Sequence, residues 1–418
     1  MQNTKFGGIK MAEIIKFDAP APLSGVPAFK GKDGIRFNNC SDGYYMAFVP
    51  SVSAEEFADY CKLLEADGFV RNYKNVIKDN VFYNYVNAES SITVYTYRCG
   101  HSSEVRIVAG TNVPAFPEKK NGKKICDPLI IQLNSSHEIL QLPEGMSYVV
   151  RVEDGSFIVI DGGYRRGCFA KMIYDVLVKT APDPDNIVIS AWYFTHDHGD
   201  HAGAFIDFGE MYWDQPITIE RLIYNFINDP EYCENFQQGF NVRTVQERDR
   251  FWPNATLHCK LNAGQKFYFG DTCLDILFGV QDFMPRDIPN EADATPKNPK
   301  KGDGNNLSVV GRFTFGNGKT FFVMGDTTSV CCDEMCARYG DFLKSDYVQM
   351  SHHGLSKPTP RAHNATIEIY DMIDAEVAFM PCSVERSGVR LEYEVNAHLA
   401  ANVKTLYVAG AGTVVVEV

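Results

Sequence analysis

The 418-residue sequence lacks the paired cysteine spacing of small zinc-binding modules. It contains 12 cysteines, but none of them forms a Cys-x-x-Cys pair. The tightest group, Cys331, Cys332 and Cys336, has no second half with which to form a zinc knuckle. We therefore expect ordinary reduced thiols, and the cytoplasm is the compartment in which such thiols persist.

The sequence also lacks long apolar runs and an excess of basic residues. No stretch approaches the roughly 20 apolar residues that span a bilayer, and the N-terminal segment has no apolar core of a secretion signal. We expect no membrane association. Lys plus Arg number 40 against 53 Asp plus Glu, which gives a formal net charge of −13. This balance repels polyanions unless a bound cation offsets it, so general nucleic-acid binding is not expected.

What is present is enough chain for two or three domains, since 418 residues is more than twice the roughly 150 residues of one domain. Residues 1–121 predict a small α+β domain of unknown role. Its helix, Ala54–Ala66, begins with a capping box formed by Ser53 and Glu56 and ends at Gly68. Strands are predicted at Tyr44–Val49, Val76–Val86, Ile92–Arg98 and Val105–Ala109.

Residues 122–418 predict an α/β domain that follows a linker of turn-forming and charged residues, Thr111–Lys124. Ile187–Phe194 is a nearly continuous apolar run, typical of a strand buried on both faces in a helix-covered sheet. Gln281–Asn306 is rich in proline and charge and predicts a long surface loop. Other predicted elements are a helix at Phe169–Lys179 and strands at Leu129–Leu133, Tyr148–Val152, Phe157–Ile160, Leu307–Phe315 and Thr320–Met324.

A cluster of histidine and aspartate directly follows the apolar strand. Its candidate ligands are His196, His198, Asp200 and His201. Strand ends carry ligand sites in α/β sheets, and imidazole with carboxylate favours zinc, with manganese or iron as alternatives. His196 and His198 can converge on one cation while Asp200 and His201 face a second, as in two-metal sites. The alternative is a polar loop that is merely rich in histidine.

The spacing His-x-His-x-Asp-His after Thr195 resembles the metal-binding motif of the metallo-β-lactamase-fold hydrolases. Three further segments resemble motifs of that family in the expected order: Phe157–Gly163, FIVIDGG; Phe322–Asp326, FVMGD; and Tyr347–Gly354, YVQMSHHG. The resemblance begins near Asp127 and implies a metallo-β-lactamase αββα sandwich, preceded by the small α+β domain. Residues 1–121 have no counterpart that we identify in the family.

The family resemblance also implies roles for single residues. Asp161 would brace the metal loop, and Asp326 would bridge two metal ions. One of His352 and His353 would supply the last ligand to the second metal, and we favour His353. Taken alone, the segments containing Asp161 and Asp326 would be ordinary turns after strands.

Two ligand sets follow from the resemblance. The first metal would bind His196, His198 and Asp326, and the second would bind Asp200, His201, Asp326 and His353. Many relatives supply a third histidine to the first metal, from a motif that this sequence lacks. The only histidine between His201 and Asp326 is His258, for which we favour a strand or loop position over a ligand role.

Further detail resembles one branch of the family. Asn305-Asn306-Leu307-Ser308 and the Ser356-Lys357 pair after the second histidine motif are similar to segments of the DNA-uptake competence protein and of teichoic-acid phosphorylcholine esterases. The resemblance implies a phosphodiester substrate. Asn305, Asn306 and Lys357 are candidate substrate contacts, although the asparagines are as well suited to shaping their own turn and Lys357 to being a solvated lysine.

The sequence therefore predicts a metal-dependent hydrolase that acts on a small-molecule or anionic ester substrate, with a phosphodiester as the favoured bond and two divalent cations as cofactors. Asp200 would orient the attacking water and pass on its proton, and His352 would contact substrate oxygen or protonate the leaving group. Hydrolysis of a lactone, thioester or amide at the same site is an alternative. A sensing or scaffolding protein with a vestigial metal site is another.

Overall fold

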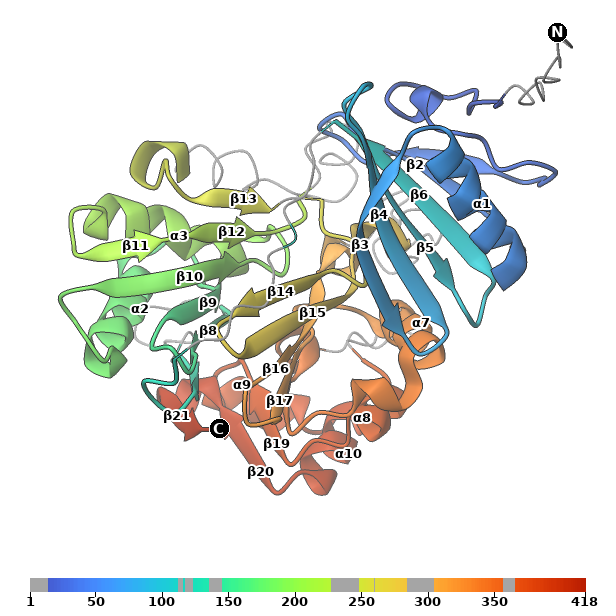
Figure 1. Cartoon of the computed structure of the whole chain (residues 1–418). Helices are drawn as coiled ribbons and strands as arrows, with labels where there is room; N and C mark the ends of the chain where they lie inside the picture. Colours follow the sequence, from blue (N-terminus) through green and yellow to red (C-terminus); the bar gives the residue numbers. More distant parts are fainter. Residues whose placement is uncertain are drawn as a thin grey trace, which may run out of the picture.

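The computed structural model describes residues 14–111, 116, 123–134, 145–226, 248–258, 260–283, 304–355 and 365–418. Two β-sheets pack face to face, and helices cover the outer face of each (Figure 1). This arrangement is the four-layer αββα sandwich expected from the sequence, so the fold class is confirmed. A third sheet, formed by the N-terminal residues, packs on one side of the sandwich (Figure 1).

The first sheet of the sandwich contains both the first and the last strands of residues 123–418, which pair with each other. Its spatial order is β13 (Thr256–His258), β12 (Arg221–Ile223), β10 (Ile187–Tyr193), β9 (Phe157–Asp161), β8 (Ser147–Arg151), β7 (Leu129–Gln132) and β21 (Val414–Glu417), and β11 (Ile217–Ile219) also pairs with β10. Strands β9 and β10 run parallel, so their carboxyl ends meet at one edge.

The second sheet changes from antiparallel to parallel pairing along its width. Its order is β14 (Lys266–Phe269), β15 (Thr272–Phe278), β16 (Val310–Thr314), β17 (Thr320–Val323), β18 (Tyr347–Gln349), β19 (Val377–Met380) and β20 (Thr405–Val408). The pairs from β17 to β20 are parallel. The carboxyl ends of β17 and β18 therefore also meet at one edge.

Apolar side chains from the facing sides of both sheets form the central core. From the first sheet they include Tyr148 and Ile160, and from the second sheet Phe313 and Phe321, all of them buried. The ring of Tyr148 meets that of Phe321 edge to face, with 5.8 Å between centroids. Burial of this seam holds the two sheets in register, so that residues at their shared edge have fixed separations.

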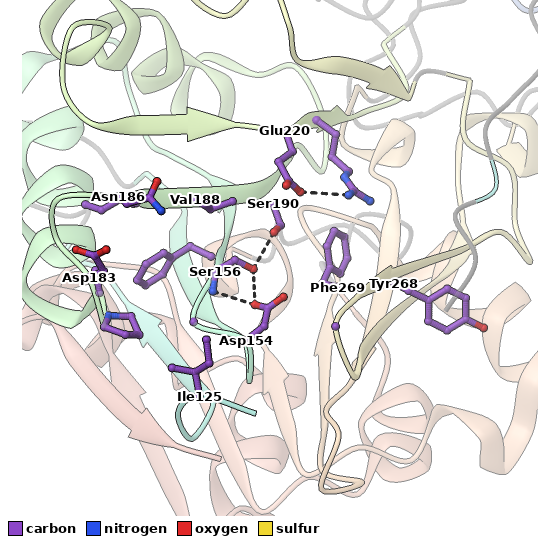
Figure 2. A pocket seen from close by; sticks show the side chains of 17 residues that line it. Ile125, Asp154, Ser156, Asp183, Asn186, Val188, Ser190, Glu220, Tyr268 and Phe269 are labelled. Carbon is purple, nitrogen blue, oxygen red and sulfur yellow. Dashed lines mark hydrogen bonds and ion pairs between the residues drawn. The ribbon is translucent and has the colours of Figure 1, made fainter. Parts of the chain in front are cut away.

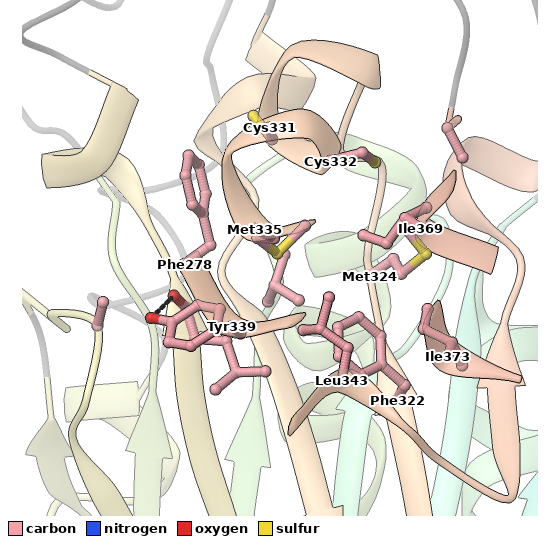
Figure 3. Packing of buried hydrophobic residues seen from close by; sticks show 14 of the residues in the cluster. Phe278, Phe322, Met324, Cys331, Cys332, Met335, Tyr339, Leu343, Ile369 and Ile373 are labelled. Atoms are coloured by element: carbon pink, nitrogen blue, oxygen red, sulfur yellow. Dashed lines mark hydrogen bonds between the residues drawn. The ribbon is translucent and has the colours of Figure 1, made fainter. Parts of the chain in front are cut away.

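Helices bury one apolar stripe against each outer face. On the first sheet these are α2 (Gly167–Thr180) and α3 (Gly199–Tyr212), and on the second they include α7 (Ser329–Tyr339) and α8 (Ile367–Ile373). Figure 3 shows Met335 and Tyr339 of α7 and Ile369 of α8 packed over Phe322 of β17. The described residues also form the helices α6 (Val280–Phe283), α9 (Val384–Arg390) and α10 (Glu394–Asn402) and the 3-10 turns η1 (Leu23–Gly25), η3 (Gly304–Leu307), η4 (Gly340–Leu343), η5 (Ser351–Gly354) and η6 (Ala409–Ala411).

The N-terminal unit is an antiparallel sheet with one helix on its outer face. The strand order is β1 (Arg36–Asn39), β2 (Tyr45–Val49), β6 (Glu104–Gly110), β5 (Ile92–Cys99), β4 (Asn80–Asn87) and β3 (Val70–Ile77). Helix α1 (Ala54–Ala66) packs Phe57 and Leu64 against this sheet. Its capping box is present as expected, with Ser53 Oγ accepting from the backbone N–H of Glu56.

The opposite face of the N-terminal sheet shares a core with the sandwich. Phe82 and Tyr97 lie in one apolar cluster with Phe278 and with residues of α7. Polar groups also cross this contact, because Tyr97 Oη donates to Asp282 Oδ1 at 2.9 Å and Arg338 Nη1 donates to the same oxygen at 2.6 Å. Arg338 and Asp282 have fully buried side chains. The N-terminal sheet therefore covers a surface of the sandwich that carries buried charge.

Several local sequence expectations were wrong. The strand expected at Val76–Val86 is two strands, β3 and β4, because the chain reverses at Lys78, whose φ is 55°. The strand expected from Leu307 begins at Val310, after the turn η3. The domain boundary at residue 121 stays a prediction, since residues 117–122 lie outside the described residues.

Among the described residues, no helix has both the length and the apolar character that crossing a membrane requires.

Arg338→Met should lower the free energy of unfolding by about 3–5 kcal/mol, because it leaves the buried Asp282 carboxylate without its guanidinium partner. Chemical denaturation of the full chain measures this change. Lys62→Met on α1 is the control, since its ion pair with Asp59 is exposed and should contribute little to the free energy of unfolding. Equal losses in both variants would contradict a special role for the buried pair.

Candidate metal centre

The candidate ligands lie together where the two sheets of the sandwich share an edge. Asp161 ends β9, and His196 to His201 follow the end of β10. Asp326 follows β17, and His352 and His353 follow β18. These strand ends come from different sheets, and the central core holds them opposite one another. The structure thus brings segments more than 100 residues apart in the sequence to one place.

Two groups of ligand atoms form at this edge and share one carboxylate. The groups are His196, His198 and Asp326, and Asp200, His201, Asp326 and His353, with the atoms of each group within 4.8 Å of one another. His201 Nε2 is 3.3 Å from Asp326 Oδ1, and His353 Nε2 is 3.4 Å from Asp200 Oδ2. Ligand atoms bound at about 2.0–2.2 Å to one tetrahedral cation lie about 3.3–3.6 Å apart. The spacing fits a divalent cation in the second group.

Several buried atoms of these groups have no hydrogen-bond partner within the described residues. They are Nε2 of His196, His201 and His353, and Oδ1 of Asp326. An unsatisfied buried polar atom costs about 1–3 kcal/mol, and a charged one costs more. Four such atoms converging on one small space are explained when each donates a lone pair to a cation. The residues present therefore fit a two-metal site.

Asp161 and Thr195 fix which imidazole nitrogens face this space. Asp161 Oδ2 lies 2.7 Å from His201 Nδ1 and accepts from Thr195 Oγ1 at 2.8 Å. Thr195 Oγ1 in turn lies 3.1 Å from Nδ1 of His196. Because both Nδ1 atoms donate into these oxygens, the Nε2 atoms keep their lone pairs for a cation. The hydroxyl of Thr195 was not singled out from the sequence, although its position directly before the histidine motif marks it.

The electrostatics of the cluster also call for positive charge. Burial raises the pKa of Asp326, but the facing imidazoles of His201, His353 and His352 outweigh it and hold this pKa well below its usual range. Burial lowers the pKa of His353, but the carboxylates of Asp326 and Asp200 raise it by more, so that the pKa is about 10. Burial and the neighbouring imidazoles of His201 and His198 keep the pKa of His196 well below its usual range. Asp326 and Asp200 thus concentrate negative charge at this buried position, which bound divalent cations would neutralise.

A strained turn aims His353 into the cluster. His352 and His353 both have positive φ, at 49° and 55°, a region that costs side-chain-bearing residues energy and is common at functional sites. His353 Nδ1 donates to the Pro381 carbonyl at 2.8 Å, and Arg390 donates to the His353 carbonyl at 2.7 Å. These bonds hold the turn, so that His353 Nε2 lies 3.6 Å from Asp326 Oδ2.

Gln349 connects the loop of Asp326 to the turn of the histidine pair. Its buried Oε1 accepts from the backbone N–H groups of Met324 and Gly325, at 2.7 and 2.8 Å. Its Nε2 donates to the carbonyls of Gly325 and Met350, at 3.0 and 2.6 Å. One side chain therefore satisfies four backbone groups of two loops. Sequence reasoning missed this role, since a glutamine in a short apolar strand has no distinctive spacing.

The other candidate residues have different positions. His352 lies outside both ligand groups, with Nε2 3.9 Å from Asp326 Oδ2 and 3.3 Å from Asn305 Nδ2. Asn306 Oδ1 accepts from Thr328 Oγ1, a contact that joins η3 to the residue before α7, and its role toward a substrate stays a prediction. Lys357 lies outside the described residues.

His258 is a residue of β13 and belongs to neither ligand group of the described residues. Burial and the nearby Arg221 lower its pKa to about 4. Its position in a strand agrees with the non-ligand role that we favoured. The ligand roles of the clustered residues themselves stay predictions.

Comparison with known proteins gives structural neighbours only. No protein-family model matches the chain, and no curated protein matches it. A solved metallo-β-lactamase with a HARLDQ motif from Cronobacter sakazakii is 16% identical over 44% of this chain, with a TM-score of 0.27, and the match spans 59% of that protein. The metallo-β-lactamase GOB-18 from Elizabethkingia meningoseptica is 13% identical, over 63% of this chain and 94% of that one, with a TM-score of 0.28.

A third neighbour, a metallo-β-lactamase from Hirschia baltica, is 8% identical over 70% of this chain and 71% of that one, with a TM-score of 0.23. All three TM-scores are below 0.5, so these matches are not used to assign the fold or the function of this chain. The fold class therefore rests on the sheet order and the four layers of this chain.

Thr195→Val should lower zinc affinity about 10- to 100-fold, because it removes the oxygen that accepts from His196 Nδ1 while keeping the side-chain shape. Competition with a chromophoric chelator measures the affinity. Thr195→Ser is the matched control, because it keeps the hydroxyl and should bind zinc as the unmodified chain does. Unchanged affinity in the valine variant would show that the hydroxyl does not orient a ligand.

Proposed function

We propose that this protein is a metal-dependent hydrolase with two divalent cations, zinc before manganese or iron. The observation that carries the proposal is the buried Asp326 carboxylate, which belongs to both groups of ligand atoms. Its Oδ1 lies 3.3 Å from His201 Nε2, and its Oδ2 lies 3.9 Å from His196 Nε2. Oδ2 also lies 3.6 Å from His353 Nε2, so this carboxylate reaches ligand atoms of both groups and is placed to bridge two ions.

When bound, two such cations would supply a nucleophilic water with a pKa near 7 and polarise the scissile bond. Asp200 is placed to hold that water, because its carboxylate is partly exposed while lying 3.4 Å from His353 Nε2. The same carboxylate can accept the proton of the water. His352 is outside the ligand groups and its side chain is 15% exposed, so it is available to donate to a substrate oxygen or to the leaving group.

We further propose a phosphodiester as the bond that is cleaved. The support is the sequence resemblance to phosphodiester-cleaving relatives, together with the position of Asn305, whose amide lies beside His352 at the cluster. Two cations would offset the formal charge of −13 for an anionic substrate. A reduced, cytoplasmic setting is consistent with the described cysteines, which are all free thiols.

Purified protein should contain about two transition-metal ions per chain and should hydrolyse bis(4-nitrophenyl) phosphate. His198→Ala and Asp326→Asn should each abolish turnover, because each removes a ligand atom of the first group. Elemental analysis and initial rates measure both quantities. His398→Ala on α10 is the control, since its partly exposed imidazole pairs with Asp371 outside the cluster. Full activity in both ligand variants would refute the proposed site.

A panel of model substrates distinguishes phosphodiesters from other esters. Metal-reconstituted protein should turn over the phosphodiester faster than a lactone, a thioester or an amide, and removal of metal by a chelator should stop turnover. Turnover of only phosphorus-free substrates would refute the phosphodiester while keeping the hydrolase. A metal-loaded protein without any turnover would favour a binding or scaffolding role.

A further inference from the structure

A cavity lies at the end of the sandwich away from the metal centre. It has a volume of about 740 Å³, within the range of small-molecule sites. Figure 2 shows its wall, which comes from the turn before β9, the start of β10, the β11–β12 connection and the β14–β15 turn. Phe157 of β9 lines the cavity, whereas Asp161 at the other end of the strand faces the metal centre. At about 3.3 Å per residue, these two residues are roughly 13 Å apart.

The hydroxyl groups in this cavity are ordered in one direction. Ser190 Oγ donates to Ser156 Oγ at 2.7 Å, and Ser156 Oγ donates to Asp154 Oδ1 at 2.7 Å (Figure 2). The direction is forced, because a carboxylate accepts only and each hydroxyl has one hydrogen. Both serine hydrogens are therefore used within the protein. What these three side chains can still offer a ligand is acceptor lone pairs.

The backbone around Ser190 is adapted to place its hydroxyl there. Pairing between β9 and β10 shifts register between Ile189 and Ala191, so Ser190 is an extra, unpaired residue. Such bulges re-aim side chains and are frequent beside binding sites. Ser190 is buried, and it is the one polar side chain in a strand, β10, whose other residues are apolar or aromatic. A buried serine here has no part in the metal centre.

The charges that line the cavity select against anions. They are Asp154, Asp183, Glu220 and Arg221. Arg221 is the only cation among the described lining residues, and it already pairs with Glu220 at 3.3 Å and lies over the ring of Phe269 at 5.3 Å. Asp154 and Asp183 therefore leave an excess of negative charge beside an apolar wall that includes Phe157 and Phe269.

We propose that this cavity binds a small organic cation: a primary ammonium group that donates to Asp154, Ser156 and Ser190, attached to an apolar or aromatic body that contacts Phe269. An ammonium group has three donor hydrogens and no acceptor, which complements an acceptor-only floor. A carboxylate ligand would face both unmatched lone pairs and like charge. The site is separate from the metal centre and does not depend on its activity.

Ligand-observed NMR titration of the full chain with 2-phenylethylammonium chloride tests the proposal. The amine should show saturation transfer from the protein, and sodium 3-phenylpropanoate, which has a similar body and opposite charge, should show none. Absence of transfer to the amine, or equal binding of both compounds, would overturn the proposal.

Asp154→Asn locates the site, because asparagine keeps the Oδ1 that accepts from Ser156 N–H at 2.9 Å, while it loses the negative charge and has an NH₂ donor in place of Oδ2. It should weaken amine binding about fivefold. Ser190→Ala, which removes one acceptor, should weaken it about twofold. Asp59→Asn on the exposed face of α1 makes the same charge change elsewhere and should have no effect. Equal weakening by Asp154→Asn and Asp59→Asn would show general charge attraction, and unchanged binding in the cavity variants would place the amine elsewhere.

Discussion

The meeting of Asp326 with imidazoles from two other segments is the constraint around which the structure is organised. A buried carboxylate needs compensating charge or hydrogen bonds, and Asp326 receives that charge from His201, His353 and His352. These histidines are distant from Asp326 in the sequence, and only the fold brings them into contact with it. The central core between the sheets holds the two sets of strand ends opposite one another, at the separation that the cluster requires.

Much of this arrangement was predictable because it depends on short local patterns. The apolar run at Ile187–Tyr193 identifies a buried strand, and the dense histidine motif after it identifies the edge at which ligands gather. The capping box of α1 was equally clear, since Ser53 and Glu56 have a spacing that serves one purpose. In each case, the residues that determine the structure are adjacent in the chain.

The parts that escaped prediction depend on contacts between distant segments. Gln349 satisfies backbone groups of two loops, which no spacing within β18 indicates. Thr195 acts only because Asp161 and His196 lie on either side of its hydroxyl. The hairpin at Lys78 was missed for another reason: valine and isoleucine flank it on both sides, and the reversal requires a positive φ from a residue that seldom adopts it.

The contact between the N-terminal sheet and α6 also affects the surroundings of the candidate metal centre. Tyr97 and Arg338 hold Asp282 of α6, and α6 in turn contacts η3, which carries Asn305 beside His352. The N-terminal sheet therefore supports, through α6, the turn that lies beside His352 at the candidate metal centre. A gene fragment encoding only residues 122–418 would carry every candidate ligand and yet leave that turn without its backing.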